Sequence, residues 1–223
     1  MSQTRSVLAL FAKAPVPGQV KTRLCPPLRP EQAAELYEAM LLDILDQHRD
    51  AAGLDLALWY TPAEACAWFE ARAPRGYALH VQQGTALAPR MSALFRRHAE
   101  QGYTRIVLRG TDSPSLPAAR FAESFTALEH ADLVLCPDRD GGYNLIGLRG
   151  PADALFELEM STSNVLQWTV DRARAMGMRV ELLAPHHDVD TAADLKLLAD
   201  ELCERGTPRT RAWLSRAGFE VGR

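Results

Sequence analysis

Four short motifs contain the residue types in this 223-residue chain that could carry out chemistry. They are FAKAPVPGQVKTRL (residues 11–24), GTDSP (110–114), DGGY (140–143) and DVDT (188–191). Three of them follow short apolar runs that are typical of buried strands, and open α/β sheets bind ligands at the carboxyl ends of their strands. Basic groups together with separated carboxylates suit the binding of a nucleotide di- or triphosphate and a divalent cation.

The basic motif predicts a phosphate-binding loop. Lys13, Lys21 and Arg23 flank a segment whose two prolines and one glycine restrict or specify the backbone, directly after the first predicted strand. Lysine supplies a point charge, and the planar guanidinium of arginine can bind two phosphate oxygens at once. A solvated surface loop would explain the same residues. The motif is neither a Walker A loop nor a G-x-G-x-x-G fingerprint, so those two classes are excluded.

The acidic motifs supply the candidate metal ligands. Asp112 follows a predicted strand that a nearby proline ends, so its carboxylate is expected to reach the crevice and bind Mg²⁺ or Mn²⁺. Capping of the next turn or helix is the alternative role for Asp112. In an extended segment, Asp188 and Asp190 lie on one side and Val189 on the other. We favour Asp190 as the second metal ligand, and either Asp190 or Thr191 could cap the following helix.

The glycine motif predicts a tight turn between two strands, with ligand contact as an additional role. Gly141 and Gly142 would allow the backbone to approach a ligand closely, because neither carries a side chain. Asp140 and Tyr143 flank them. We therefore include residues 140–143 among the candidate substrate-binding residues.

The histidines, cysteines and serines are not expected to form a site. His186 and His187 resemble metal ligands, but oxygen-rich Mg²⁺ sites rarely need imidazole, so we interpret them as surface residues. The four cysteines lack Cys-x-x-Cys spacing, which indicates neither a zinc knuckle nor a disulfide framework. No Gly-x-Ser-x-Gly elbow is present, so a serine hydrolase is not supported.

The composition limits the classes of partner. The net charge is -3, with 25 basic and 28 acidic residues, and no polybasic segment exists to bind nucleic acid or an anionic membrane. The apolar run at residues 7–12 is too short for a signal peptide or a membrane span. We expect a cytoplasmic protein without membrane insertion.

Alternating strand and helix patterns predict an α/β fold with a mainly parallel central sheet and helices on both faces. Strands are expected at residues 6–12, 54–60, 77–81, 106–109, 133–136, 143–148 and 180–183, and helices at 30–45, 63–72, 88–101, 117–130, 162–176 and 191–203. The runs at 133–136 and 143–148 are too close for a crossover helix, so an antiparallel element is expected. We expect a single domain at residues 1–204, followed by a helix or tail at 205–223.

Together and in this order, the four motifs resemble those of a bacterial glycosyltransferase-like family of uncharacterised domains, the DUF2064 type. The resemblance spans about residues 8–198. The family is similar to phospholactate guanylyltransferase and molybdenum cofactor nucleotidyltransferases and looks like a member of the GT-A nucleotide-diphospho-sugar transferase superfamily. The resemblance implies a Rossmann-like GT-A fold, a nucleotide in the crevice, and Mg²⁺ or Mn²⁺.

Position by position, the resemblance places Lys21 and Arg23 on the phosphates, Asp112 and Asp190 on the metal, and the two glycines of DGGY near the acceptor or sugar. We assign Asp112 and Lys21 as the catalytic residues. The chain departs from the family at residues 84–91, where Arg90 remains as a candidate substrate-binding residue but an acidic or amide residue and a glycine are missing. It also has Asn144 where the family commonly has a second tyrosine.

These observations predict a metal-dependent nucleotide-diphospho-sugar transferase acting on a small-molecule acceptor. Nucleotidyl transfer from a nucleoside triphosphate is the first alternative, because the superfamily contains both reactions. A non-catalytic nucleotide-binding domain is the second, because the segment at residues 84–91 is altered. The expected partners are a nucleotide or nucleotide sugar and the acceptor, and a homodimer is left open.

Overall fold

The apolar runs of the sequence form the strands of one seven-stranded sheet in the computed structural model, which describes residues 5–51, 53–157, 164–202 and 207–221. The strands are β1 (Ser6–Lys13), β2 (Asp55–Thr61), β3 (Tyr77–Val81), β4 (Arg105–Arg109), β5 (Leu133–Pro137), β6 (Tyr143–Leu148) and β7 (Val180–Leu182). Their order across the sheet is β3-β2-β1-β4-β6-β5-β7. Strand β6 is antiparallel to β4 and β5, and the other neighbouring pairs are parallel.

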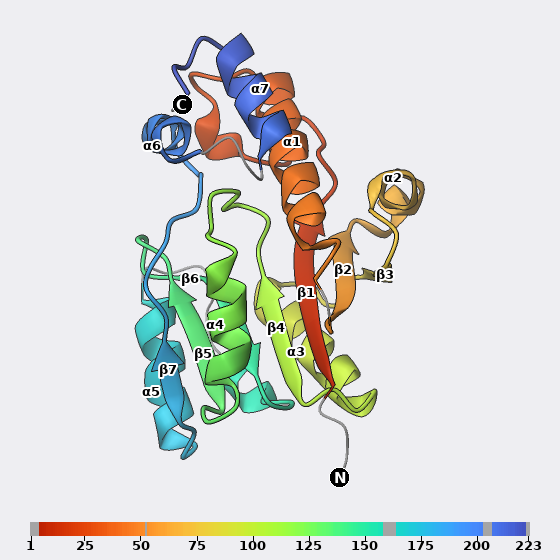
Figure 1. The fold of residues 1–223 in the computed structure, drawn as a ribbon, viewed down its shortest axis with the longest axis vertical. Helices are drawn as coiled ribbons and strands as arrows, with labels where there is room; N and C mark the ends of the chain where they lie inside the picture. The colour runs from red at the N-terminus through yellow and green to blue at the C-terminus, as the bar shows by residue number, and fades with distance from the viewer. Residues whose placement is uncertain (1–4, 52, 158–163, 203–206, 222–223) are drawn as a thin grey trace.

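The helices lie on both faces of the sheet (Figure 1). They are α1 (Pro30–His48), α2 (Cys66–Arg72), α3 (Leu87–Glu100), α4 (Ala119–Ala127), α5 (Val165–Ala175), α6 (Ala192–Glu201) and α7 (Pro208–Arg216). Short 3-10 turns occupy Thr22–Leu24 (η1), Ala63–Ala65 (η2) and Asp153–Phe156 (η3). The mostly parallel α/β fold with an antiparallel element is therefore confirmed.

The element boundaries differ from the sequence-based ones in detail. The helix expected at 63–72 is divided into η2 and α2, and the helix expected at 117–130 is shortened to α4. Residues 162, 163 and 203, at the ends of two expected helices, lie outside the described residues. None of these changes moves a motif away from the carboxyl edge of the sheet.

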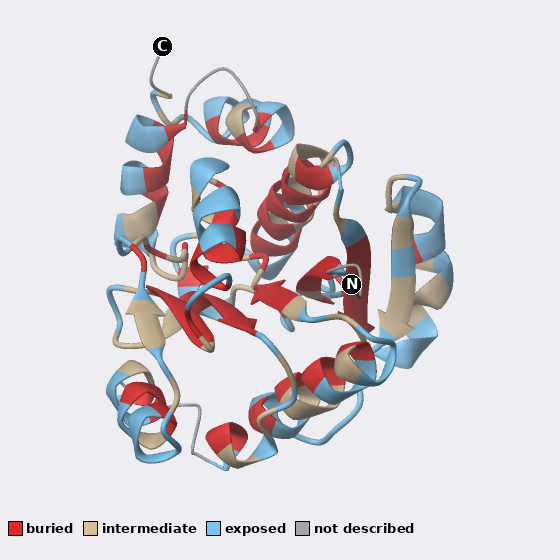
Figure 2. Ribbon diagram, turned by 60° about the horizontal axis from the view of Figure 1, so that its bottom comes forward, coloured by how far each residue is buried: buried red, intermediate tan, exposed pale blue. Residues whose placement is uncertain are grey.

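Two apolar layers hold the sheet between its helices. Alternate strand residues face α1, α2 and α4 on one side, as Leu10 does, and α3 and α5 on the other, as Ala9 does. In Figure 2 the central strands are buried, while the outer faces of the helices are exposed. This two-sided burial explains why the central strands are almost continuously apolar.

A third apolar cluster lies outside the sheet, between α1, α6 and α7. Leu24 and Val189 both belong to it and are fully buried; Leu24 ends the basic motif and Val189 lies within the DVDT motif. The buried Asp43 carboxylate of α1 accepts hydrogen bonds from the Thr210 backbone N–H and hydroxyl, both at 2.8 Å. This contact fixes the start of α7 on α1 (Figure 1). The proposed division after residue 204 stays a prediction.

The reversed direction of β6 places its first residues beside the ends of the parallel strands. Arg109, the last residue of β4, pairs with Leu145 of β6, and Leu10 of β1 pairs with Arg109. The turn before β6 therefore lies at the same edge as the loops that follow β1 and β4. Within the described residues, no helix has the length and apolar character needed to cross a membrane.

Candidate active site

A cleft of about 620 Å³ opens at this carboxyl edge. The predicted site residues that line it are Lys13, Lys21, Arg23, Arg90, Asp112, Gly142, Tyr143 and Asp190. The predicted residues Asp140 and Gly141 are not among its lining residues. Loops that are far apart in the sequence thus meet around one cavity, at the position where open α/β sheets bind their ligands.

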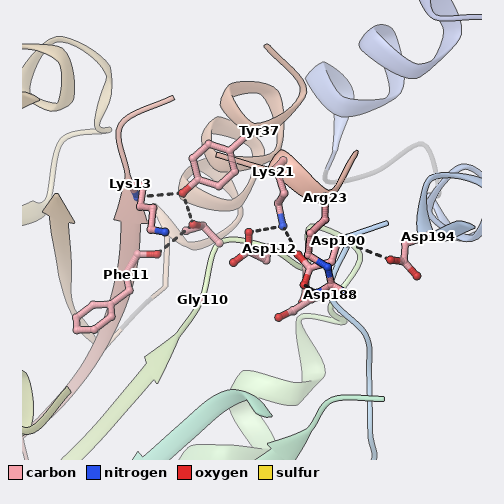
Figure 3. A network of polar contacts seen from close by, with 12 residues as sticks. Phe11, Lys13, Lys21, Arg23, Tyr37, Gly110, Asp112, Asp188, Asp190 and Asp194 are labelled. Atoms are coloured by element: carbon pink, nitrogen blue, oxygen red, sulfur yellow. Dashed lines mark hydrogen bonds and ion pairs between the residues drawn. The ribbon is translucent and has the colours of Figure 1, made fainter. Parts of the chain in front are cut away.

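Lys21 lies between the two predicted metal ligands (Figure 3). Its Nζ contacts Asp112 Oδ1 and lies 3.1 Å from Asp190 Oδ1, and only 4% of its side chain is exposed. Burial alone would lower the pKa of Lys21, but the charges of Asp112 and Asp190 outweigh burial and hold it above its ordinary value. The ammonium group therefore stays charged and joins the two acidic loops.

The backbone at Lys21 is locally strained. Lys21 has φ 47° and ψ 37°, and it is the one non-glycine residue with a positive φ in the described part of the chain. A left-handed conformation is unfavourable for a residue with a Cβ and persists where surrounding contacts impose it. Here those contacts are the carboxylates that hold the ammonium group and the burial of Leu24 in the third cluster.

The loop after β7 directs Asp190 toward the basic motif. Asp190 Oδ2 lies 3.1 Å from Arg23 Nη1, and the Arg23 side chain is 65% exposed. Val189 is buried on the opposite side of the backbone, and its N–H donates to the Asp112 carbonyl at 2.9 Å. Both Asp188 and Asp190 line the cleft, as alternation in an extended segment predicts.

The capping alternatives are resolved by the hydrogen bonds at the start of α6. The N-cap residue is Thr191, and Asp194 Oδ2 accepts from the Thr191 backbone N–H at 2.7 Å and its hydroxyl at 2.8 Å. Asp190 therefore does not cap α6. Asp112 does not cap α4 either, because the N-cap of that helix is Ala118. Both carboxylates remain available to the cleft.

A chain of hydrogen bonds holds the ends of β1 and β4 together (Figure 3). The Lys13 N–H donates to Tyr37 Oη at 3.0 Å, and Tyr37 Oη lies 2.8 Å from Thr111 Oγ1. The Thr111 hydroxyl donates to the Phe11 carbonyl at 3.0 Å. Because that bond uses the single hydroxyl proton of Thr111, Tyr37 must donate to Thr111. Burial, with a smaller effect of Asp112, raises the pKa of Tyr37 to about 12, so this donor persists at neutral pH.

A buried arginine supports the GTDSP loop from below. Arg109 is 1% exposed, and its Nη2 donates to the Ser113 carbonyl at 2.8 Å and its Nε to the Gly110 carbonyl at 3.0 Å. Its Nη1 lies 2.9 Å from His48 Nε2. Burial, followed by the charge of Arg109, lowers the pKa of His48 to about 3, so His48 is neutral and can accept.

Two further carboxylates make this part of the cleft strongly acidic. Asp188 accepts a hydrogen bond from the Ser113 hydroxyl, and its own N–H donates to Asp138 Oδ1 at 3.2 Å. Burial, followed by the charge of Asp112, raises the pKa of Asp188 to about 7. Burial and the neighbouring Asp140 raise that of Asp138 to about 6. The neighbouring negative charges thus make the ionised form of Asp138 and Asp188 less favourable.

The DGGY motif forms the turn between β5 and β6. Gly141 has φ 91°, a conformation that disfavours any residue with a Cβ, which explains its glycine. Asp140 Oδ1 accepts from the Gly142 N–H at 2.9 Å, so this carboxylate stabilises its own turn. A Cβ at Gly142 would lie 3.1 Å from the same oxygen. Gly142 and Tyr143 reach the cleft, whereas Asp140 shapes the turn.

The other end of the cleft is lined mainly by apolar side chains from β1, α3, β4, β6 and α5. We call this set the apolar end: Phe11, Met91, Leu108, Ile146 and Val165. Asn144 lines the cleft among them, is only 6% exposed, and has no hydrogen-bond partner for either Oδ1 or Nδ2 within the described residues. Both amide atoms are thus buried without a partner in the described part of the chain, on a residue that lines the cleft.

Arg90 is held at the rim of the cleft by the altered segment at residues 84–91. Its Nε donates to the Gly84 carbonyl at 2.8 Å, and its Nη1 lies 3.4 Å from Gln82 Oε1. The Gln82 amide donates to the carbonyls of Ala12 and Trp59 at 3.1 and 2.9 Å. These hydrogen bonds connect the segment to the ends of β1 and β2 and fix Arg90 at the cleft.

Sequence reasoning missed the supporting residues and misjudged one histidine. Tyr37 lies in the helix predicted at residues 30–45, and Arg109 ends the strand predicted at 106–109. Only the polar atoms of these two side chains indicated that they could also support the site. The interpretation of His187 as a surface residue was wrong, because its side chain is 3% exposed, while His186 is half-buried. His187 lies two residues before Val189, which is buried in the third apolar cluster. Burial of Val189 therefore places the segment around His187 close to the interior.

Comparison with known proteins identifies the family. Residues 44–163 match the family described as uncharacterized proteins conserved in bacteria (DUF2064). The chain is a DUF2064 protein. A search of curated proteins finds no match for it.

Solved structures share the fold of this DUF2064 protein. A Desulfovibrio desulfuricans G20 protein described as a candidate nucleotide-diphospho-sugar transferase is 32% identical, with a TM-score of 0.88 over 96% of this chain and 95% of that one. A cytidylyltransferase from Leptospira borgpetersenii is 11% identical, with a TM-score of 0.56 over 96% and 95%. The 4-diphosphocytidyl-2C-methyl-D-erythritol synthase of Anaerococcus prevotii is 12% identical, with a TM-score of 0.55 over 95% and 97%. The last two likenesses establish the Rossmann-like transferase fold alone.

Proposed function

We propose that this DUF2064 protein is a metal-dependent transferase that moves a sugar from a nucleotide diphospho-sugar to a small-molecule acceptor. The observation that carries the proposal is the position of the Lys21 ammonium group between Asp112 and Asp190 at the wall of the cleft. The description of the 32% identical Desulfovibrio protein supports sugar transfer. The cleft volume of about 620 Å³ lies within the range of small-molecule sites.

The donor atoms fit a divalent cation. Asp112 and Asp190 present carboxylate oxygens, which Mg²⁺ and Mn²⁺ prefer, and the ammonium group of Lys21 already occupies a position that attracts positive charge. Asp112 and Asp190 would hold the ion. When bound, the ion would neutralise negative charge on the diphosphate.

Lys21 and Arg23 would bind the phosphate oxygens. Transfer joins the acceptor oxygen to the anomeric carbon and breaks the bond from that carbon to the diphosphate, so a nucleoside diphosphate leaves and the acceptor proton is released. The leaving group gains negative charge, which the buried Lys21 ammonium group and the exposed Arg23 guanidinium group would stabilise. The remaining contribution of the chain is to hold donor and acceptor in position.

The sugar or the acceptor would bind at the apolar end. Asn144 has an amide NH2 donor group and a carbonyl acceptor, both without a partner in the described residues, and hydroxyl groups would use both. Gly142 has no side chain to block close approach, and Tyr143 and Arg90 also line the cleft. The chain-specific Asn144 is thus the residue expected to discriminate between substrates that differ in one hydroxyl.

The test is a panel of nucleotide sugars and nucleoside triphosphates, each with and without Mg²⁺ or Mn²⁺. Binding is measured by thermal shift, and turnover is measured as nucleoside diphosphate released from the nucleotide sugar with water as the acceptor. The proposal expects metal-dependent stabilisation by one nucleotide sugar together with diphosphate release. Both signals are expected to disappear in Asp112→Asn and to persist in the control Asp50→Asn, whose side chain is 87% exposed and outside the cleft.

Other outcomes would replace the proposal. Pyrophosphate release from a triphosphate supplied with a sugar phosphate would indicate nucleotidyl transfer. Metal-dependent binding without any turnover would indicate a non-catalytic nucleotide-binding domain. Full turnover in Asp112→Asn would overturn the assignment of the metal ligands.

A further inference from the structure

Three potential metal ligands meet behind the acidic loop. His186 and His187 follow β7, and Glu201 is the last residue of α6. One ligand atom from each lies within 4.8 Å of the others, and this is the one such group of histidine, cysteine and acidic residues that a search of the described residues finds. Residues before and at the end of α6 thus lie close together in the fold.

The buried imidazole of His187 lacks a hydrogen-bond partner among the residues that the structure describes. Its side chain is 3% exposed, and neither Nδ1 nor Nε2 is hydrogen-bonded within the described residues. Glu201 Oε2 lies 3.6 Å from Nε2, beyond hydrogen-bond distance. An unpaired buried polar group is costly, so the arrangement requires a partner that the surrounding side chains do not supply.

The other two ligands are held in place by Ser115. The Ser115 hydroxyl donates to Glu201 Oε2 at 3.0 Å and lies 3.0 Å from His186 Nε2. The two histidine rings are 4.9 Å apart, although consecutive side chains of an extended segment normally point to opposite sides. The backbone of this segment therefore brings both imidazoles to the same side, close to the carboxylate.

We propose that His186, His187 and Glu201 form a binding site for a divalent cation of the Zn²⁺ class. Two imidazoles and one carboxylate are a recurrent three-ligand set for Zn²⁺, and water or the adjacent Ser115 oxygen completes the coordination. The oxygen ligands Asp112 and Asp190 instead suit Mg²⁺ or Mn²⁺. The chain would thus carry two cation sites of different chemistry in the continuous segment at residues 186–190.

A bound ion would link the end of α6 to the segment that contains Asp188 and Asp190. This segment also contacts the GTDSP loop through the hydrogen bond from Val189 N–H to the Asp112 carbonyl. The ion would therefore stabilise the position of both acidic loops without contacting the nucleotide.

Co²⁺ is the probe for the site, because its visible absorption reports nitrogen and oxygen ligands in a tetrahedral arrangement. The chelator-treated full chain is titrated with Co²⁺, and Zn²⁺ is then added to displace it. We expect one tightly bound Co²⁺ per chain with tetrahedral absorption. Glu201→Gln and His187→Gln are expected to weaken its binding by at least about tenfold.

Two control variants distinguish this site from the others. His130→Gln alters an exposed histidine that is paired with Glu181, and Asp190→Asn alters the proposed Mg²⁺ site, so both should keep the Co²⁺ spectrum. Because the Glu201 side chain is 34% exposed, Glu201→Gln is expected to fold even if His187→Gln does not.

The inference is wrong if no stoichiometric Co²⁺ or Zn²⁺ binds, or if Glu201→Gln binds Co²⁺ as tightly as the unmodified chain. Loss of the signal in Asp190→Asn with retention in Glu201→Gln would also overturn it, because the ion would then occupy the acidic cleft. Failure of sugar transfer leaves these outcomes unchanged, since the readout is metal binding alone.

Discussion

At the charged end of the cleft, formed by Lys21, Arg23, Asp112, Asp188 and Asp190, every side chain has a polar partner within the protein. At the apolar end, the amide of Asn144 has no hydrogen-bond partner in the described ranges of the chain. Both ends line the same cavity and lie on the same edge of the sheet. The two ends differ in whether a ligand must replace existing interactions of the protein in order to bind.

A ligand at the charged end must exchange partners, because its phosphates and metal compete with ion pairs that already exist. A ligand that hydrogen-bonds to the Asn144 amide breaks no hydrogen bond of that amide within the described residues. The first end therefore favours ligands with strong charge, and the second favours ligands of the correct shape. Substitutions at the two ends are expected to have different signs as well as different sizes.

The largest effect is expected for Asp112→Asn. Loss of the carboxylate removes a metal ligand and one of the two anionic partners of Lys21. Turnover should fall by about a thousandfold, the scale seen when one charge-stabilising group is lost. The measurement is the rate of nucleoside diphosphate release at saturating metal, with Asp50→Asn as the matched control. Equal rates in the two variants would contradict the role of Asp112.

Lys21→Met should separate metal binding from catalysis. Removing the buried ammonium group leaves Asp112 and Asp190 without their shared cation, so the affinity for Mn²⁺ in the absence of nucleotide should rise. Turnover should nevertheless fall by about a hundredfold, because phosphate charge is no longer stabilised. Calorimetric titration with Mn²⁺ and steady-state kinetics test the two effects. Unchanged turnover would exclude Lys21 from phosphate binding.

Asn144→Leu should have opposite effects on stability and on substrate binding. The leucine side chain has a similar size and removes two buried unpaired polar atoms, so the free energy of unfolding should rise by about 1 kcal/mol. Affinity for the substrate should fall by about tenfold because the amide contacts are lost. Urea unfolding and ligand titration measure the two changes. A loss of stability with unchanged affinity would show that the amide serves the fold.

The last effect acts on stability alone and concerns the buried residues Trp59 and His98. Trp59 Nε1 donates to His98 Nε2 at 3.1 Å, and burial, followed by the charge of His80, lowers the pKa of His98 to about 4. The unfolded chain binds a proton near pH 6.5 while the folded chain does not, so stability should fall as the pH drops from about 6.5 to about 4.

This contribution of His98 is at most about 1.4 kcal/mol per pH unit. Urea unfolding across this range measures the slope, and His98→Gln should make it shallower. An unchanged slope in His98→Gln would show that other groups dominate, with His48 as the next candidate because its pKa is lowered to about 3.

The fold and the meeting of the motifs could be predicted because both follow from local patterns. Apolar runs marked the strands, and the short gap before Tyr143 predicted the antiparallel element. The carboxyl-edge rule then brought Lys21, Asp112 and Asp190 together.

The partners of individual side chains could not be predicted, because they depend on contacts that only the folded chain creates. Lys21 was expected to face phosphate, yet it lies between two carboxylates. Asp140 was expected in the cleft, yet it bonds within its own turn. His187 was expected at the surface, yet it is buried beside Glu201. For Lys21 and His187 the neighbouring carboxylates come from segments distant in the sequence, whereas Asp140 is held by the geometry of its own turn.

The reversed strand β6 gives the sheet a second way to bring residues to the ligand edge. A parallel strand can bring new residues to the ligand edge only through the loop that follows it, and that loop leads into a crossover helix. In the β5–β6 hairpin at residues 133–148, the turn lies at the ligand edge and both ends lie at the opposite edge. No helix separates its two strands. Gly142, Tyr143 and Asn144 therefore reach the ligand edge together through one short turn, independently of any crossover helix.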